Sequence, residues 1–284
     1  MSARHTSLDA VRGVAVLGIL AMNVVSYGLG FAPYFNLSAG GNATVVDWAI
    51  GGLGEVFVDQ KFMGLFSLLF GASVLLFLER AEAKGRRAAR LSLWRNLLLL
   101  GIGLAHAALW SGDVLTLYAV CAPALLLVRR WSARALAAAG VACLAAIAPI
   151  VLWGQAQVDP AGAALGDLWR VGADPDDPRA WTTWVTFIAD VSLRALGMML
   201  LGMAAYRAGV VTGARSERTY RRMARWGLGV GLPLSAAGLA WVVARGFDPS
   251  VGLVHNLPNL AATLPVTAGY LGALLLAATF LALG

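Results

Sequence analysis

Long apolar stretches alternate with short polar connectors along the whole chain. A membrane-spanning helix needs about 20 consecutive, mostly apolar residues, and eight stretches of this chain approach that length. The stretch at 114–128 is the shortest of them. The pattern therefore predicts eight membrane spans, at about residues 14–32, 61–79, 94–111, 114–128, 135–153, 184–206, 226–244 and 260–283.

The apolar stretches also decide the fold class. Backbone groups in lipid must be hydrogen-bonded within the protein, which leaves helices or closed barrels. Barrel strands alternate apolar and polar residues, whereas these stretches are apolar throughout. We predict an all-α, polytopic transmembrane helix bundle that forms a single domain over residues 1–284, with a motif-rich region at 8–120 and further spans at 121–284. The chain ends within an apolar stretch without a polar flank, so we expect it to be truncated at its C-terminus.

The composition agrees with a membrane protein. Of the 284 residues, 59% are hydrophobic and 13% are charged, and the mean hydropathy is +0.73. Soluble globular domains lie far from these values, so the lipid bilayer is the principal expected partner. The first apolar stretch has no small-residue cleavage site and begins with Asp9 and Arg12, which indicates a membrane helix and not a cleaved signal peptide.

The basic residues predict the orientation. Of the 22 lysines and arginines, 17 fall on the side of the predicted topology that also holds the N-terminus, and five fall elsewhere. By the positive-inside rule this crowded side is cytoplasmic. Loops that face anionic lipid headgroups are expected to be rich in arginine, which accounts for the net charge of +7 without a nucleic-acid partner.

The sequence carries no pattern that indicates a metal site or a disulfide framework. Cys121 and Cys143 lie within predicted spans and without CxxC spacing, so we interpret them as small core residues. The patterns GxSxG, P-loop and HExxH are also missing from the sequence. We therefore predict no metal cofactor.

Polar residues occur at the start of the first predicted span and within it. Asp9 and Arg12 are three residues apart and can pair on one helix face. This pair either fixes the helix start or leaves Arg12 to bind an anionic ligand such as a coenzyme phosphate. Asn23 lies further along the same helix, where an amide usually forms an interhelical hydrogen bond.

Lys61 opens the second predicted span from the outer side, against the positive-inside trend. Two interpretations stay open. The side chain either extends to the outer headgroups, or it provides a cation to an internal cavity near His106 or Asp113.

The segment 103–120 (GLAHAALWSGDVLTLYAV) carries the best candidates for chemistry. His106 and Asp113 are seven residues apart, so a continuous helix would hold them about 10 Å apart, too far for direct contact. Gly112 is expected to break the helix and let Asp113 cap the next span. His106 is either hydrogen-bonded to a neighbouring helix or acts as a general base, since imidazole titrates near physiological pH.

Two further groups of polar residues lie in the second half of the chain. Asp190 and Arg194 are four residues apart within the sixth predicted span, where we expect them to pair with each other. The alternative is that Arg194 holds an anionic group. His255 precedes the eighth span and is interpreted as a solvated loop residue, with a role in an outward-facing site as the alternative.

Three ordered segments carry a family resemblance: LDAVRGVAVLGILAMN, KFMGLFSLLFGAS and RNLLLLGIGLAHAALWSGDVLTLYAV, between Leu8 and Val120. On these segments the chain resembles the YeiB-like family of bacterial multi-pass membrane proteins, which have no settled function. More distantly, the LD-x-x-RG opening resembles that of the membrane acyltransferases, which include heparan-α-glucosaminide N-acetyltransferase. In the bacterial polysaccharide O-acyltransferases of this group, a histidine proposed as catalytic stands at the position of Asn23. The glucosaminide enzymes have an asparagine there and a catalytic histidine shortly beyond it, and the corresponding stretch SYGLGFAPYF has no histidine here. An acyltransferase would therefore take its base from His106.

The resemblance implies a multi-pass protein of the bacterial inner membrane that moves an acyl group from a cytoplasmic acyl-CoA to a small-molecule, glycan or lipid acceptor on the outer side. In this hypothesis Asp113 orients His106, Arg12 beside Asp9 binds the donor phosphates, and Asn23 and Lys61 stabilise the oxyanion. The alternative is a transporter or flippase for a small anionic or amphipathic solute, which would use the same residues and Arg194 as a binding cavity. A non-catalytic membrane partner is the third hypothesis, and a homo-oligomer is compatible with all three.

Overall fold

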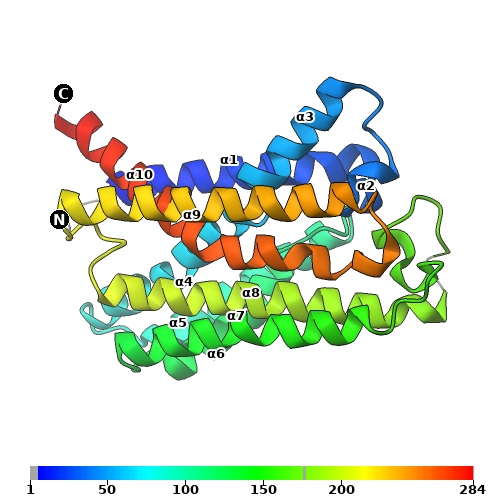
Figure 1. Cartoon of the computed structure of the whole chain (residues 1–284). Helices are drawn as coiled ribbons and strands as arrows, with labels where there is room; N and C mark the ends of the chain where they lie inside the picture. Colours follow the sequence, from blue (N-terminus) through cyan, green and yellow to red (C-terminus); the bar gives the residue numbers. More distant parts are fainter. Residues whose placement is uncertain (1–5, 175–176, 284) are drawn as a thin grey trace.

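A computed structural model describes residues 6–174 and 177–283. The described residues form an all-helical bundle whose long helices run side by side (Figure 1). The start of α1 and the end of α10 lie at the same end of the bundle. The long helices are α1 (Thr6–Leu29), α4 (Lys61–Glu82), α5 (Ala88–Ala107), α6 (Leu115–Val128), α7 (Ala133–Gln155), α8 (Trp181–Arg207), α9 (Glu217–Ala244) and α10 (Leu257–Leu283).

The connections at the opposite end hold short helical pieces. The 38-residue apolar segment Val45–Glu82 is interrupted, because α4 is preceded by α3 and a π-helical turn that ends just before Asp59. The short pieces are α2 (Ala32–Phe35), η1 (Leu37–Ala39), α3 (Val45–Leu53), η2 (Gly54–Val58), η3 (Ala163–Leu168), η4 (Pro178–Ala180), η5 (Pro249–Val251) and η6 (Val254–Asn256).

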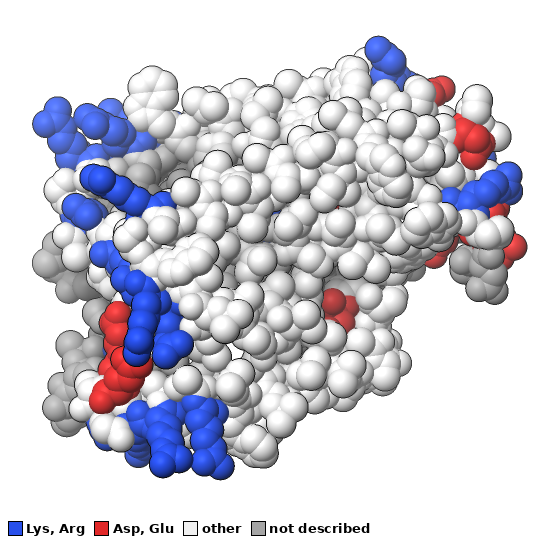
Figure 2. Space-filling view, turned by 90° about the horizontal axis from the view of Figure 1, so that it is seen from below, with Lys and Arg blue, Asp and Glu red and all other residues white. Residues whose placement is uncertain are grey.

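All eight predicted spans correspond to helices. By length and composition, six segments in the described part are long and apolar enough to cross a membrane, and α6 is a shorter apolar helix of 14 residues. In Figure 2 the lysines and arginines gather mainly at one end, several acidic residues lie at the other, and the broad surface between them is almost free of charged residues. The prediction of a helical membrane protein is therefore confirmed.

Helices α4 and α8 pack against each other at the centre of the bundle. Leu65 and Leu69 of α4 and Met198 and Met199 of α8 have no more than 1% of their surface exposed. The close approach depends on glycine, because a Cβ atom on Gly202 would lie 1.8 Å from the backbone oxygen of Leu68. Small residues at helix crossings are a common way to bring membrane helices together.

We expect Gly202→Ala to lower the free energy of unfolding by about 1–3 kcal/mol, since the added methyl group must push α4 and α8 apart. Gly229→Ala is the matched control, because a Cβ atom there would have nothing within 4 Å. That control should be neutral or stabilising by up to about 1 kcal/mol. Unfolding of both variants in detergent checks the prediction, and equal stability of the two would contradict the close packing.

Candidate functional site

The turn between α5 and α6 holds His106 and Asp113 in direct contact. The Nδ1 atom of His106 lies 2.8 Å from Oδ1 of Asp113. The expectation that these residues are too far apart was wrong, because α5 ends at Ala107 and the chain folds back through a turn before α6 begins. The predicted helix break and the cap are confirmed: the backbone N–H groups of Leu115 and Thr116 donate to Asp113 at 3.1 and 2.7 Å.

The contacts of Asp113 determine how the imidazole is protonated. Burial raises the pKa of Asp113, but hydrogen bonds from Thr116, His106 and Leu115 outweigh burial and hold the pKa below its ordinary value. Asp113 is therefore a carboxylate and can only accept a hydrogen bond. Nδ1 of His106 must then donate to Asp113, so in the neutral form of the imidazole the free lone pair lies on Nε2. This is the arrangement in which a carboxylate orients a histidine as a general base.

Aromatic rings connect this turn to α1. The ring of Trp110 lies 5.6 Å from the ring of His106 and 4.7 Å from the ring of Tyr27, measured between centroids. These contacts place the last turn of α1 beside the dyad of His106 and Asp113.

A cavity of about 450 Å³ opens beside the dyad, between α1, α2, the α5–α6 turn and α8. Its volume suits a ligand of the size of a small metabolite or a short acyl chain. Trp110 and Asp113 line it, whereas His106 is not one of the lining residues and has 40% of its side chain exposed. Most of the remaining lining is apolar and aromatic, including Phe31, Phe35, Trp184 and Phe187.

Asn23, which the sequence placed within the first span, lines the same cavity and is 8% exposed. Asp9 and Arg12 lie at the other end of α1. Their predicted pairing is confirmed at 3.1 Å, and Arg12 also donates to Ser73 of α4. The structure therefore places Asn23 on the wall of the cavity that Asp113 also lines, and leaves Arg12 at the far end of α1.

Neither interpretation of Lys61 was right. The side chain is fully buried, so it does not reach the headgroups, and it contacts neither His106 nor Asp113. Its ammonium group donates to the Glu55 carbonyl at 2.6 Å, to Ser235 at 2.8 Å and to Asn259. With all three N–H donors used, Lys61 has none left for an oxyanion.

Lys61 belongs to a buried polar network that the sequence did not predict. Asn259 of α10 joins Lys61 to Asp59 by donating its amide at 3.1 Å, and Tyr34 also donates to Asp59. Burial and the neighbouring Asp59 carboxylate raise the pKa of Tyr34 well above its ordinary value, so its phenol stays protonated. The sequence feature that could have indicated this network is the polar run Asp59–Gln60–Lys61 within an apolar segment. In the structure Gln60 has a left-handed backbone conformation, with a φ of 59°.

The network continues to α8 through Arg194. The predicted pairing of Asp190 and Arg194 is confirmed, with the guanidinium group 2.8 Å from both carboxylate oxygens. Arg194 also donates to Thr263 at 3.3 Å, and Thr263 donates to the carbonyl of Asn259. Since Arg194 is 1% exposed and already paired, it provides no open site for an anion.

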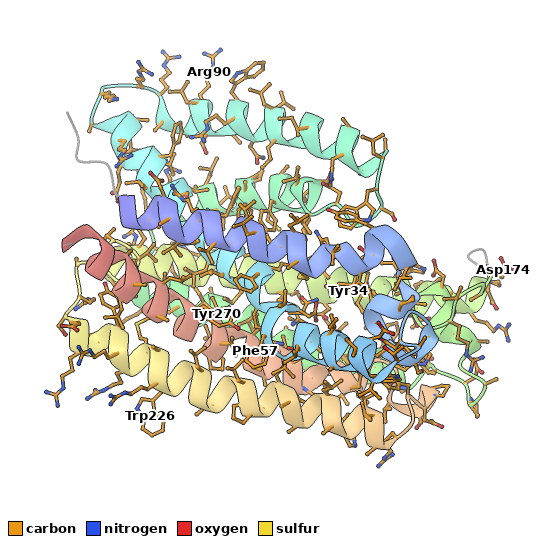
Figure 3. All side chains as sticks on the ribbon, turned by 90° about the horizontal axis from the view of Figure 1, so that it is seen from above. Tyr34, Phe57, Arg90, Asp174, Trp226 and Tyr270 are labelled. Carbon is orange, nitrogen blue, oxygen red and sulfur yellow. The ribbon has the colours of Figure 1, made fainter. Side chains whose placement is uncertain are left out.

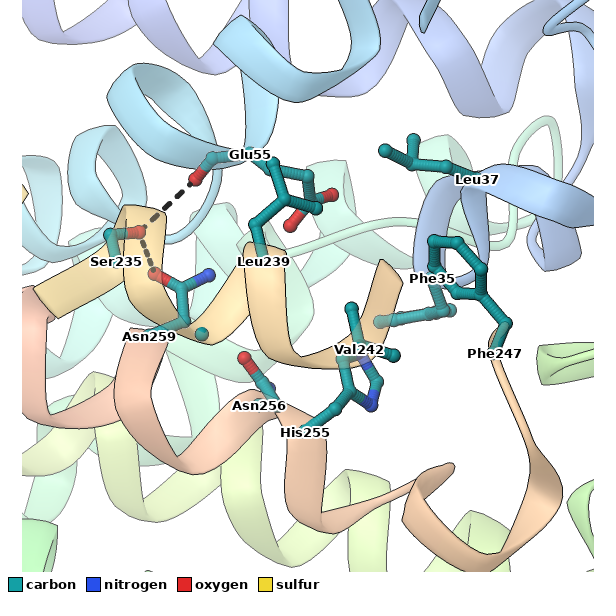
Figure 4. A pocket seen from close by; sticks show the side chains of 11 residues that line it. Phe35, Leu37, Glu55, Ser235, Leu239, Val242, Phe247, His255, Asn256 and Asn259 are labelled. Atoms are coloured by element: carbon teal, nitrogen blue, oxygen red, sulfur yellow. Dashed lines mark hydrogen bonds between the residues drawn. The ribbon is translucent and has the colours of Figure 1, made fainter. Parts of the chain in front are cut away.

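His255 is not a solvated loop residue. Its ring packs 5.2 Å from the ring of Trp169, and its Nδ1 atom lies 3.2 Å from the Val251 carbonyl. Figure 4 shows His255, Asn256 and Glu55 around a small pocket of about 20 Å³, which has room for little more than one water molecule. The prediction was wrong because η5 and η6 fold the connection onto the helix ends.

No cluster of three or more His, Cys, Asp or Glu side chains able to hold a metal ion occurs within residues 6–174 and 177–283. The same part of the chain has both cysteines free, Cys121 being buried and Cys143 partly buried.

Comparison with known proteins reveals bacterial relatives. The chain is 34% identical over 258 residues to the uncharacterized protein YeiB of Escherichia coli. The matched region covers 84% of this chain and 65% of YeiB. It is also 37% identical over 131 residues to the uncharacterized protein YxaH of Bacillus subtilis. This second match covers 43% of this chain and 32% of YxaH. No family model and no solved structure matches. The chain thus spans just under two thirds of YeiB and about one third of YxaH, and it is a homologue of these uncharacterized proteins.

Proposed function

We propose that this protein is a membrane acyltransferase that uses acyl-CoA as its donor. The observation that carries the proposal is the contact of 2.8 Å between His106 and a hydrogen-bonded Asp113, beside a cavity of about 450 Å³. An oriented histidine with a free Nε2 lone pair is suited to remove a proton from a hydroxyl or amine acceptor. The aromatic lining of the cavity is suited to an acyl chain or to the apolar part of an acceptor.

The reaction needs one proton carrier. Nε2 of His106 takes the proton of the acceptor as its oxygen or nitrogen attacks the thioester carbonyl. The carbon–sulfur bond then breaks, and the imidazolium returns the proton to the leaving thiolate. Asn23 is the side chain on α1 that lines the cavity with an amide donor for the developing oxyanion. Lys61 no longer has this role in our proposal.

The donor would enter from the basic end of the bundle. Arg12 lies near that end on α1, and Asn23 follows 11 residues later, ~16 Å further along the helix. A donor with its phosphates at Arg12 and its thioester near Asn23 would therefore extend along α1. By the positive-inside rule this end faces the cytoplasm, which gives a cytoplasmic N-terminus, a bacterial inner-membrane location and an acceptor on the outer side.

Binding of the donor tests the proposal. A saturating acyl-CoA at about 100 times its dissociation constant should stabilise the purified chain by ~2.7 kcal/mol. Arg12→Ala should weaken the apparent affinity about tenfold, since it removes a charged hydrogen bond. Arg221→Ala is the control, because Arg221 is an exposed residue of α9 that pairs with Glu217. Absence of stabilisation by both acetyl-CoA and longer acyl-CoA molecules would refute the donor.

The interrupted segment before α4 favours transport as the second candidate function. Buried polar groups and irregular backbone at a break in a membrane helix are typical of transporter binding sites, and Asp59, Gln60 and Lys61 lie at such a break. A transporter for a small anionic or amphipathic solute needs no thioester. The acyl-CoA titration therefore separates the two functions, because transport predicts no stabilisation.

A further inference from the structure

A second candidate binding site lies on the outer surface of the bundle, away from the dyad. A shallow, open groove with about 840 Å³ of space lies along the residues just before α5 and the first half of α5, and this one segment supplies its whole lining. Figure 3 shows Arg90 on the side of α5 that points away from the other helices. The groove is lined by Arg86, Arg87, Arg90, Leu91, Leu93, Trp94 and Leu97.

The lining residues divide into a basic end and an apolar end. Arg90, Trp94 and Leu97 follow one another at spacings of four and three residues, so they form one row along the helix. Leu93, Trp94 and Leu97 keep 48%, 58% and 56% of their surface exposed. The row from Arg90 to Leu97 extends ~10 Å, and the exposed side chain of Leu104 continues this face of α5.

The arginines of the groove have no side-chain partner among the residues that the structure describes. In the described part of the chain, Arg86, Arg87 and Arg90 form no ion pair and no side-chain hydrogen bond. Some other arginines at the same end do find partners: Arg12 pairs with Asp9, Arg221 pairs with Glu217, and Arg207 donates to a backbone carbonyl. Three unpaired guanidinium groups beside one another offer many donors to an anion with several oxygens, such as a phosphate.

We infer that this groove binds one anionic phospholipid. The phosphate and headgroup contact Arg86, Arg87 and Arg90, and an acyl chain lies over Leu93, Trp94 and Leu97. The combination of charge and apolar surface decides the occupant. A soluble phosphate compound would use only the basic end, whereas a phospholipid uses both ends at the depth where headgroups meet acyl chains. Basic pockets of this kind on the cytoplasmic side of membrane helices are suited to anionic lipids.

Lipid titration of the purified full chain tests the inference, with thermal unfolding and native mass spectrometry as readouts. The probes are phosphatidylglycerol, phosphatidylcholine and sn-glycerol 3-phosphate. Phosphatidylglycerol should stabilise the protein and form a one-to-one adduct, and the other two should not. The triple variant R86Q/R87Q/R90Q should bind phosphatidylglycerol at least about tenfold more weakly. Trp94→Ala with Leu97→Ala should also weaken binding, because it removes the apolar end.

The matched control is R218Q/R222Q/R225Q, which removes the same charge from α9 at the same end of the bundle. This control should bind phosphatidylglycerol like the wild type. Equal loss in both triple variants would show a diffuse effect of charge and overturn the site. Equal binding of phosphatidylcholine would also overturn it, and so would binding of glycerol phosphate as tight as that of the lipid.

Discussion

Replacing Arg194 with alanine is expected to lower the free energy of unfolding by about 3–5 kcal/mol. Arg194 is 1% exposed, and its guanidinium group contacts both oxygens of Asp190 and the hydroxyl of Thr263. The substitution leaves the Asp190 carboxylate buried without a cation and also leaves a void. Because removal of one partner of a buried pair strands the other charge, this effect exceeds the net stabilisation by the pair itself.

The exposed pair of Arg221 and Glu217 provides the control. Both pairs have a spacing of four residues on a helix, but Arg221 keeps 58% of its side chain exposed. Arg221→Ala should change the free energy of unfolding by no more than about 0.5 kcal/mol. Chemical unfolding of both variants in the same detergent gives the comparison. If Arg194→Ala is as mild as Arg221→Ala, the buried network does not stabilise the bundle.

The helices were predictable because membrane hydropathy is a local property. A stretch of about 20 apolar residues specifies a span whatever the rest of the chain does. The pairing of Asp190 with Arg194, and that of Asp9 with Arg12, was predictable for the same reason, since helix geometry brings residues three or four apart together.

The site was only partly predictable because it depends on turns and distant helices. The contact of His106 with Asp113 requires the chain to reverse after Ala107, which helical spacing cannot reveal. The hydrogen-bond partners of Lys61 on α9 and α10 lie 174 and 198 positions away in the sequence. A lone lysine at the start of a span gives no sign of such partners.

Replacing His106 with glutamine is expected to reduce acyl transfer about 10²- to 10⁴-fold, the usual contribution of a general base. Glutamine retains polar hydrogen-bonding groups near Asp113 but cannot take a proton from the acceptor. Asp113→Asn should also reduce the rate, because an amide beside Nδ1 favours the tautomer whose Nε2 atom is protonated. The double variant should be little slower than His106→Gln, since the two residues act as one unit.

Acetyl transfer from labelled acetyl-CoA by inside-out membrane vesicles tests the role of the dyad most directly. Vesicles that contain the wild-type protein should incorporate label into a membrane or luminal acceptor. Vesicles with the same amount of folded His106→Gln protein should incorporate about 10²- to 10⁴-fold less. Full incorporation by His106→Gln, or no incorporation by the wild type above vesicles that lack the protein, would contradict a catalytic dyad of His106 and Asp113.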